Sequence, residues 1–126
     1  MKILVVDDEE DVKSLFEQKF RKEIRSGQFA FSFAFSGEEA LQFLAEHPSE
    51  VVMILSDINM PGMSGIELLK SIRKDFPTAP PQVMMITAYG DSQNHDQAMK
   101  LGADDFLTKP VNFPELKEKL MQLPLS

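Results

Sequence analysis

Short apolar segments alternate five times with longer amphipathic segments along this chain of 126 residues. Apolar runs of this length indicate β-strands, whereas apolar side chains that recur every three or four residues indicate helices. Strands that alternate with helices predict an α/β protein, in which a parallel sheet is covered by helices on both faces. Right-handed crossovers leave few topologies for such a sheet. The five apolar segments are residues 3–6, 29–35, 51–55, 82–87 and 103–108.

Capping residues mark where several of the predicted helices begin. Ser36 and Ser64 each precede a glutamate by three residues, which is the capping-box pattern. Asn112 stands before the last amphipathic segment and favours an N-cap there. The first helix carries apolar residues from 12 to 24, and Gly27 is a suitable stop. We therefore expect five helices, one after each strand.

Length and composition indicate one domain spanning residues 1–126, with a core of residues 1–123 and a tail or linker start at 124–126. Cysteine is absent, which excludes disulfides, thiolate metal sites and a cysteine nucleophile. The net charge of −7 repels nucleic-acid phosphates, so we expect no direct binding of DNA or RNA. The apolar run after Met1 and Lys2 is too short for a signal peptide or a membrane span, which favours a cytoplasmic protein.

Polar residues follow four of the five predicted strands. Asp7 and Asp8 come after the first strand, Asp57 after the third, Thr87 at the end of the fourth and Lys109 just past the fifth. The carboxyl ends of parallel strands meet at one edge of the sheet, where α/β proteins place their binding crevice. We therefore expect these five side chains to converge.

The chemistry of this set favours phosphoryl transfer. Three neighbouring carboxylates repel one another, and a hard divalent cation with oxygen ligands, such as Mg²⁺, relieves that repulsion. Lys109 adds an ammonium group and Thr87 a hydroxyl donor. A cation, an ammonium and a hydroxyl around a carboxylate would neutralise a transferring phosphoryl group. The carboxylate itself can be the nucleophile, which gives an aspartyl phosphate.

These residues stand in motifs that resemble the receiver domain of response regulators in two-component signalling. The resemblance covers residues 2 to about 123 and implies a flavodoxin-like, doubly wound sheet of strand order 2-1-3-4-5, as in chemotaxis receivers. Any one of the motifs is weak, but together they follow the strand ends in the right order. The motifs are Val6–Glu9, Asp57–Gly62, Thr87–Ala88 and Lys109–Pro110.

The resemblance implies a role for each matching residue. Asp57 would accept the phosphoryl group and would bind Mg²⁺ together with Asp8 and the backbone carbonyl of Asn59. Asp7 would act on the metal mainly through water, and Lys109 would pair with the phosphoryl group. The Lys109–Pro110 bond is often cis in this family.

The resemblance also implies a switch and partners. Thr87 would hydrogen-bond the phosphoryl group, and Phe106 would be the rotating aromatic of the switch. The phosphodonor would be a sensor histidine kinase or a phosphotransfer protein. The face formed by the last two helices and the fifth strand would be the homodimer surface. The domain would catalyse only its own phosphorylation and dephosphorylation, and no membrane contact is implied.

Other interpretations of single residues remain open. Residues 7–11 are five consecutive acids, a pattern that is often only a solvated helix start. Phe106 could be a plain core residue, and His47 and His95 look like surface residues without partners. The segment 29–35 places phenylalanine at every second position, which favours a core face beneath the first helix over an exposed contact surface.

Other functions fit the sequence less well. A phosphatase with an aspartyl nucleophile typically needs a second acid two residues after it, where this chain has Asn59. A flavin-binding protein needs a phosphate-binding loop after the first strand, where Asp7 and Asp8 would repel a phosphate. A binding module that has lost phosphorylation would not need the complete acidic set. The chain could also be the N-terminal receiver of a longer effector protein.

Overall fold

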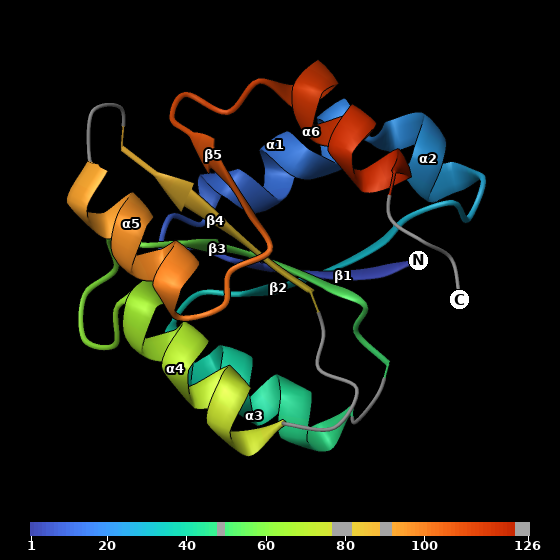
Figure 1. Ribbon diagram of the computed structural model, residues 1–126. Helices are drawn as coiled ribbons and strands as arrows, with labels where there is room; N and C mark the ends of the chain where they lie inside the picture. Colours follow the sequence, from blue (N-terminus) through green and yellow to red (C-terminus); the bar gives the residue numbers. More distant parts are fainter. Residues whose placement is uncertain (48–49, 77–81, 89–91, 123–126) are drawn as a thin grey trace.

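The computed structural model describes residues 1–47, 50–76, 82–88 and 92–122. Five parallel strands form one sheet in the order β2-β1-β3-β4-β5 (Figure 1). The predicted α/β fold, its parallel sheet and its strand order are confirmed. The strands are β1 (Lys2–Val6), β2 (Ala30–Ala34), β3 (Met53–Asp57), β4 (Gln82–Thr87) and β5 (Asp105–Thr108).

Helices cover both faces of the sheet. In Figure 1, α1, α2 and α6 lie on one side of the strands, and α3, α4 and α5 lie on the other. No helix within the described ranges is long and apolar enough to cross a membrane. The helices are α1 (Asp11–Lys19), α2 (Arg21–Arg25), α3 (Gly37–Glu46), α4 (Gly65–Asp75), α5 (Ser92–Lys100) and α6 (Phe113–Met121).

The first predicted helix is divided at Phe20, so the described residues contain six helices instead of five. Phe20 has φ −110° and ψ 25°, outside the helical region. Its N–H still donates to the carbonyl of Phe16 at 2.9 Å, and its own carbonyl accepts from Ile24 at 2.9 Å. Backbone hydrogen bonds therefore continue through the bend at Phe20 that separates α1 from α2, and the Phe20 side chain is buried in the core.

The central strands carry continuous apolar runs because both of their faces are buried. Ile3 and Val5 on β1 contribute to the core beneath α1 and α6, whereas Leu4 and Val6 contribute to the core beneath α3 and α4. All four side chains are almost completely inaccessible to solvent. Burial on both faces explains why the sequence shows continuous apolar runs in place of strict alternation.

Phenylalanine rings from three parts of the chain pack together on one face of the sheet. Phe31 from β2 lies 5.6 Å from Phe16 and 5.1 Å from Phe20, measured between ring centroids. Phe113 at the start of α6 lies 5.3 Å from Phe16. Phe29 and Phe33 join the same cluster, which confirms the core interpretation for them. Phe35 lies beyond the end of β2 and is not part of this cluster.

The predicted caps are present where the structure describes them. Ser64 and Glu67 form a full capping box at the start of α4. The side chains of Ser36 and Asn112 accept hydrogen bonds from the N–H groups three residues ahead. Gly27 ends α2 with φ 81°, a conformation that favours glycine. The predicted cap of α5 at Asp91 or Ser92 lies outside the described residues and side chains.

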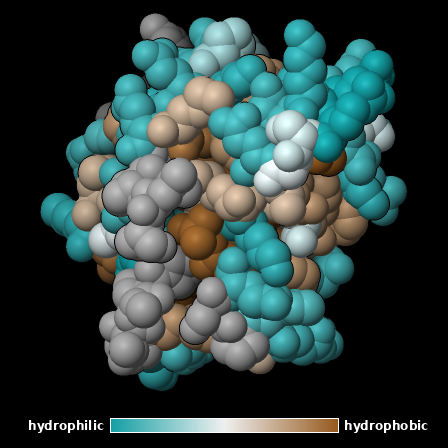
Figure 2. Space-filling view, turned by 90° about the vertical axis from the view of Figure 1, so that its right-hand side faces the viewer, coloured by the Kyte–Doolittle hydropathy of each residue, from teal (hydrophilic) through white to brown (hydrophobic). Residues whose placement is uncertain are grey.

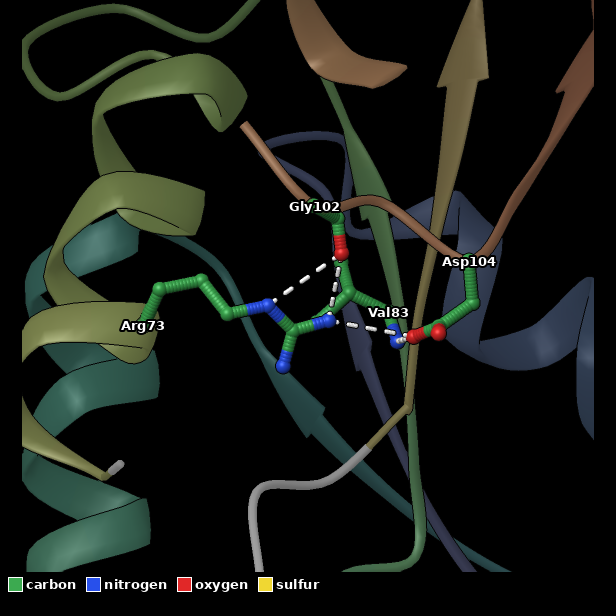
Figure 3. A network of polar contacts seen from close by, with 4 residues as sticks. All are labelled: Arg73, Val83, Gly102 and Asp104. Atoms are coloured by element: carbon green, nitrogen blue, oxygen red, sulfur yellow. Dashed lines mark hydrogen bonds and ion pairs between the residues drawn. The ribbon is translucent and has the colours of Figure 1, made fainter. Parts of the chain in front are cut away.

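A polar network joins α4 to the loop between α5 and β5 (Figure 3). Arg73 donates from Nε and Nη2 to the carbonyl oxygen of Gly102, at 3.2 and 2.7 Å. Arg73 Nη2 also lies 3.1 Å from Asp104 Oδ2, which accepts a second hydrogen bond from the N–H of Val83 at 2.8 Å. These contacts fix the starts of β4 and β5 relative to α4.

Candidate functional site

The sheet brings the predicted site residues to one edge. Asp7 directly follows β1, Asp57 ends β3, Thr87 ends β4, and Lys109 directly follows β5. Asp7, Asp57 and Thr87 are buried, whereas Asp8 is exposed. The convergence that the strand order predicts is therefore present.

Three carboxylates form the centre of this edge. Asp7, Asp8 and Asp57 each present one carboxylate oxygen, and these oxygens lie within 4.8 Å of one another. The Asp7 side chain is oriented by the N–H of Glu9, which donates to Oδ1 at 2.9 Å. The backbone N–H of Asp7 donates to the carbonyl of Ala34 at 3.1 Å, which extends the pairing of β1 with β2.

Lys109 reaches across the sheet edge to Asp57. Its Nζ donates to Asp57 Oδ2 at 2.8 Å, and the Lys109 side chain is 39% exposed against 3% for Asp57. The backbone N–H of Lys109 donates to the carbonyl of Thr87 at 2.8 Å, which holds the loop after β5 beside β4. The Lys109–Pro110 peptide bond is cis, as the sequence resemblance implied.

The site is electrostatically crowded. Burial raises the pKa of Asp7, and the nearby charges of Asp57 and Glu9 act in the same direction. The N–H of Glu9 and the ammonium of Lys109 lower that pKa only in part. Burial alone would lower the pKa of Lys109, but its hydrogen bond to Asp57 and the acids around it outweigh burial and raise the pKa. Lys109 is therefore positively charged at neutral pH. Its charge offsets only part of the burial that raises the pKa of Asp7.

The carboxylate set fits a hard divalent cation. Oxygen ligands at this mutual spacing are what Mg²⁺ takes in proteins, and a cation among them would offset the burial cost borne by Asp7. The exposed position of Asp8 leaves one side open to water or to phosphate oxygens. Asn59 is also exposed, and its N–H donates to Asp57 Oδ1 at 3.3 Å.

Gly65 supports the site in a way that the sequence interpretation missed. A Cβ at this position would collide with the backbone oxygen of Asp57 and would lie 2.7 Å from the Cα of Ile58. The N–H of Gly65 donates to the carbonyl of Ile58 at 2.8 Å. The start of α4 therefore packs directly on the backbone that carries Asp57. The sequence signal was a glycine immediately after the N-cap serine at 64, a helix position that glycine disfavours.

Phe106 lies at the partly exposed margin of the core. Its ring is packed against the imidazole of His95 on α5, with the ring centroids 3.8 Å apart. His95 thus has a packing partner that the sequence did not indicate, although its side chain is 30% exposed. His47 also has partners, since its ring stacks on Phe43 and its Nδ1 lies 2.8 Å from Glu50, and its side chain is 42% exposed. The role of Phe106 in a switch stays a prediction.

Residues 3–121 match the family model described as the response regulator receiver domain. The chain is 38% identical over 120 residues to the response regulator protein PilR of Pseudomonas aeruginosa and covers 24% of that protein. It is 35% identical over 119 residues to the transcriptional regulatory protein CpxR of Escherichia coli K12 and covers 47% of it. These matches take in 93% and 94% of the chain. The chain thus spans less than half the length of either relative.

A solved structure of the chemotaxis protein CheY4 of Vibrio cholerae has the same fold. It superposes with a TM-score of 0.81 at 25% identity, and the match covers 98% of each chain. A receiver domain of a Francisella response regulator is 32% identical, with a TM-score of 0.79 over 95% of this chain and 93% of the other. Similarity therefore extends over nearly the whole chain in both sequence and fold.

Proposed function

The chain belongs to the response regulator receiver family, and from that premise we propose that it is a phosphorylation-controlled signalling switch with Asp57 as its phosphoryl acceptor. The observation that carries the proposal is the position of Asp57 at the centre of the acidic cluster and in contact with Lys109. A receiver is not a conventional enzyme: the chain catalyses its own modification and does not turn over a separate substrate.

We infer a histidine kinase or a phosphotransfer protein as the donor. A carboxylate oxygen of Asp57 attacks the phosphorus of a phosphohistidine in line with the P–N bond. A P–O bond forms, the P–N bond breaks, and the imidazole leaves with its electron pair and takes up a proton. The Lys109 ammonium, already 2.8 Å from Asp57, offsets the negative charge that arrives with the phosphoryl group.

Asp7, Asp8 and Asp57 would hold the metal ion, with the backbone carbonyl of Asn59 as a further ligand. Bound Mg²⁺ would supply charge neutralisation for the phosphoryl oxygens. Asp7 would act on the metal mainly through water. The raised pKa of Asp7 supports a place for it near the metal, because an anion that is costly to bury gains from a nearby cation.

The acyl phosphate would then bias a conformational equilibrium. Thr87, buried at the end of β4, would hydrogen-bond the phosphoryl group. Phe106 would change its packing in response, and the face of α5, β5 and α6 would carry the signal or form a homodimer. The half-buried position of Phe106 supports this role, because a fully enclosed ring would have no second position to occupy.

The location of the protein and the extent of the domain complete the proposal. We propose a cytoplasmic receiver spanning residues 1–126, with a core of 1–123. The end of that core at residue 123 and the expected tail or linker start at 124–126 lie outside the residues that the structure describes. The relatives that it matches are longer, which supports the alternative that the receiver is one part of a longer effector protein. Direct binding of nucleic acid or membrane by the receiver itself is not part of this function.

The test is phosphorylation by a small-molecule donor. Incubation with acetyl phosphate and Mg²⁺ should add the mass of one phosphoryl group to the intact protein, and EDTA should prevent the gain. If the protein gains no phosphoryl group under these conditions, the alternative of a binding module that is not phosphorylated replaces the proposal.

A further inference from the structure

A strongly basic segment stands out on this acidic protein. Four of the 13 basic residues of the chain lie between Lys19 and Arg25, where Glu23 is the only acid. The segment carries a charge of +3, whereas the whole chain carries −7. The segment includes the end of α1 and all of α2, and its basic side chains are exposed. The segment 19–25 is therefore a local basic region on a domain that is acidic as a whole.

The basic segment lines a groove of about 490 Å³ between α1, α2 and α6. In Figure 1 these three helices lie together on one side of the sheet. The face in Figure 2 is hydrophilic along most of its margin and has hydrophobic residues nearer its centre. The residues that line the groove are Gln18, Lys19, Arg21, Lys22, Glu23 and Lys117.

The acid in this groove forms its ion pair with a lysine of α6 and not with the exposed cations of α1 and α2. The Glu23 carboxylate is buried and paired with Lys117 of α6. Its hydrogen bond with Lys117 is the main reason that the pKa of Glu23 is lowered, so the Glu23 carboxylate is ionised at neutral pH. One charge of each sign therefore cancels in the wall of the groove and holds α2 against α6.

The remaining basic side chains are available to a ligand. Arg21, Lys22 and Arg25 form no ion pair with any residue that the structure describes. Lys19 lies 5.9 Å above the ring of Phe113, which positions its ammonium at the rim of the groove without neutralising it. The groove thus presents three exposed cations, Lys19, Arg21 and Lys22, none of which forms an ion pair with a residue that the structure describes.

We propose that this groove docks an acidic segment of a partner protein. Charge complementarity selects an anionic ligand, because exposed cations on an otherwise acidic surface steer and orient such a partner. A short acidic peptide can contact these cations without extending over the acidic remainder of the surface. Duplex nucleic acid or a lipid bilayer would have to approach over a much wider area, where the net charge of −7 repels phosphates.

The docking groove lies away from the phosphorylation site. The N–H of Phe29 donates to the carbonyl of Glu23, and β2 begins at the next residue. The groove therefore adjoins the amino end of β2, whereas the acidic cluster stands at the carboxyl ends of the strands. The inference goes beyond the proposed function and does not depend on Asp57 being phosphorylated.

Fluorescence anisotropy with a labelled oligoglutamate peptide tests the proposal on the unphosphorylated protein. The variant Arg21→Gln/Lys22→Gln removes two groove cations and leaves the Glu23–Lys117 pair in place. The matched control is Lys70→Gln/Lys74→Gln, which makes the same change of charge on exposed positions of α4. Circular dichroism establishes that both variants fold.

The peptide should bind the wild-type protein, and an oligoglutamine peptide of equal length should not. The groove variant should weaken binding about fivefold or more, and the α4 control less than about twofold. Binding should weaken as salt is added, since the cations are exposed. The proposal is overturned if both variants weaken binding equally, if no peptide binds, or if the groove cations are needed only for duplex DNA or anionic vesicles.

Discussion

At the scale of single residues, the position of Asp57 depends on close packing between its backbone and Gly65 at the start of α4. Gly65 leaves no space for a side chain against the Asp57 carbonyl and the Ile58 Cα. Gly65→Ala should therefore displace the end of β3 or the start of α4, and it should cost about 2 kcal/mol of stability. Urea unfolding measures that loss, and the rate of phosphorylation by acetyl phosphate should fall with it.

Gly37→Ala is the matched control for this substitution. Its new Cβ would meet the side chain of Met63, with Sδ at 2.7 Å, and a flexible methionine can move aside. We expect a smaller loss of stability and an unchanged phosphorylation rate. Equal effects of the two substitutions would show that the contact with the Asp57 backbone has no special importance.

The charge of Asp7 gives a prediction about metal removal. The pKa of Asp7 is raised from its ordinary value of 3.8, so the Asp7 carboxyl group binds a proton more tightly in the folded protein than in the unfolded chain. Its contribution to stability is therefore full below pH 3.8 and is lost as the pH rises through the folded pKa. At pH 7 in EDTA, Asp7→Asn should be more stable than wild type, by up to about 1 kcal/mol.

In saturating Mg²⁺, the wild-type protein should instead be more stable than Asp7→Asn. The cation offsets the charge of Asp7 in the wild-type protein, so saturating Mg²⁺ should raise its melting temperature more than that of Asp7→Asn. Differential scanning calorimetry with EDTA and with Mg²⁺ measures both changes. The same melting shift in the two proteins would argue against Asp7 taking part in the metal site.

At the scale of secondary-structure elements, two polar contacts join parts of the fold that are distant in sequence. Asp104 accepts hydrogen bonds from both Arg73 and the N–H of Val83 (Figure 3). Asp104→Ala should leave the Val83 N–H without this partner and cost about 1–2 kcal/mol. Thermal unfolding tests this value against Glu118→Ala, an exposed change on α6 that should have little effect. Equal stabilities would mean that the network does not fix α4.

The pair of Glu23 and Lys117 fixes α2 against α6 and should depend on pH. Because the pKa of Glu23 is lowered from 4.5, its stabilising contribution is full above pH 4.5 and is lost as the pH falls through the folded pKa. Glu23→Gln should cost about 1 kcal/mol at pH 7. Below pH 4.5 the stability of Glu23→Gln should fall less steeply with decreasing pH than that of wild type. Parallel stability curves from chemical unfolding would contradict this.

At the scale of the whole molecule, the sequence was sufficient for the sheet and the placement of the site. Asp7, Asp57 and Thr87 lie at or directly after the carboxyl ends of parallel strands and so share one edge of the sheet. Local pattern and topology together therefore predicted their convergence. The roles of Asp57, Lys109 and Phe106 remain predictions, because geometry alone does not report reactivity or motion.

Features that depend on packing between distant segments could not be predicted. The bend at Phe20 accompanies the packing of its ring against Phe29 and Phe31. The spacing of apolar residues within one helix does not indicate these contacts. Likewise, nothing near Glu23 in the sequence indicates Lys117 as its partner. Such contacts depend on how the helices lie across the sheet, and only the folded chain brings their residues together.

The central claim is that Asp57 is the phosphoryl acceptor, and localisation of the modification tests it most directly. After incubation with acetyl phosphate and Mg²⁺, borohydride reduction converts an acyl phosphate into a stable mark that peptide mass spectrometry can locate. We predict the mark at residue 57 alone in wild type and no mark in Asp57→Asn. A mark at Asp7 or Asp8 in the wild-type protein, or equal phosphorylation of Asp57→Asn, would contradict the claim.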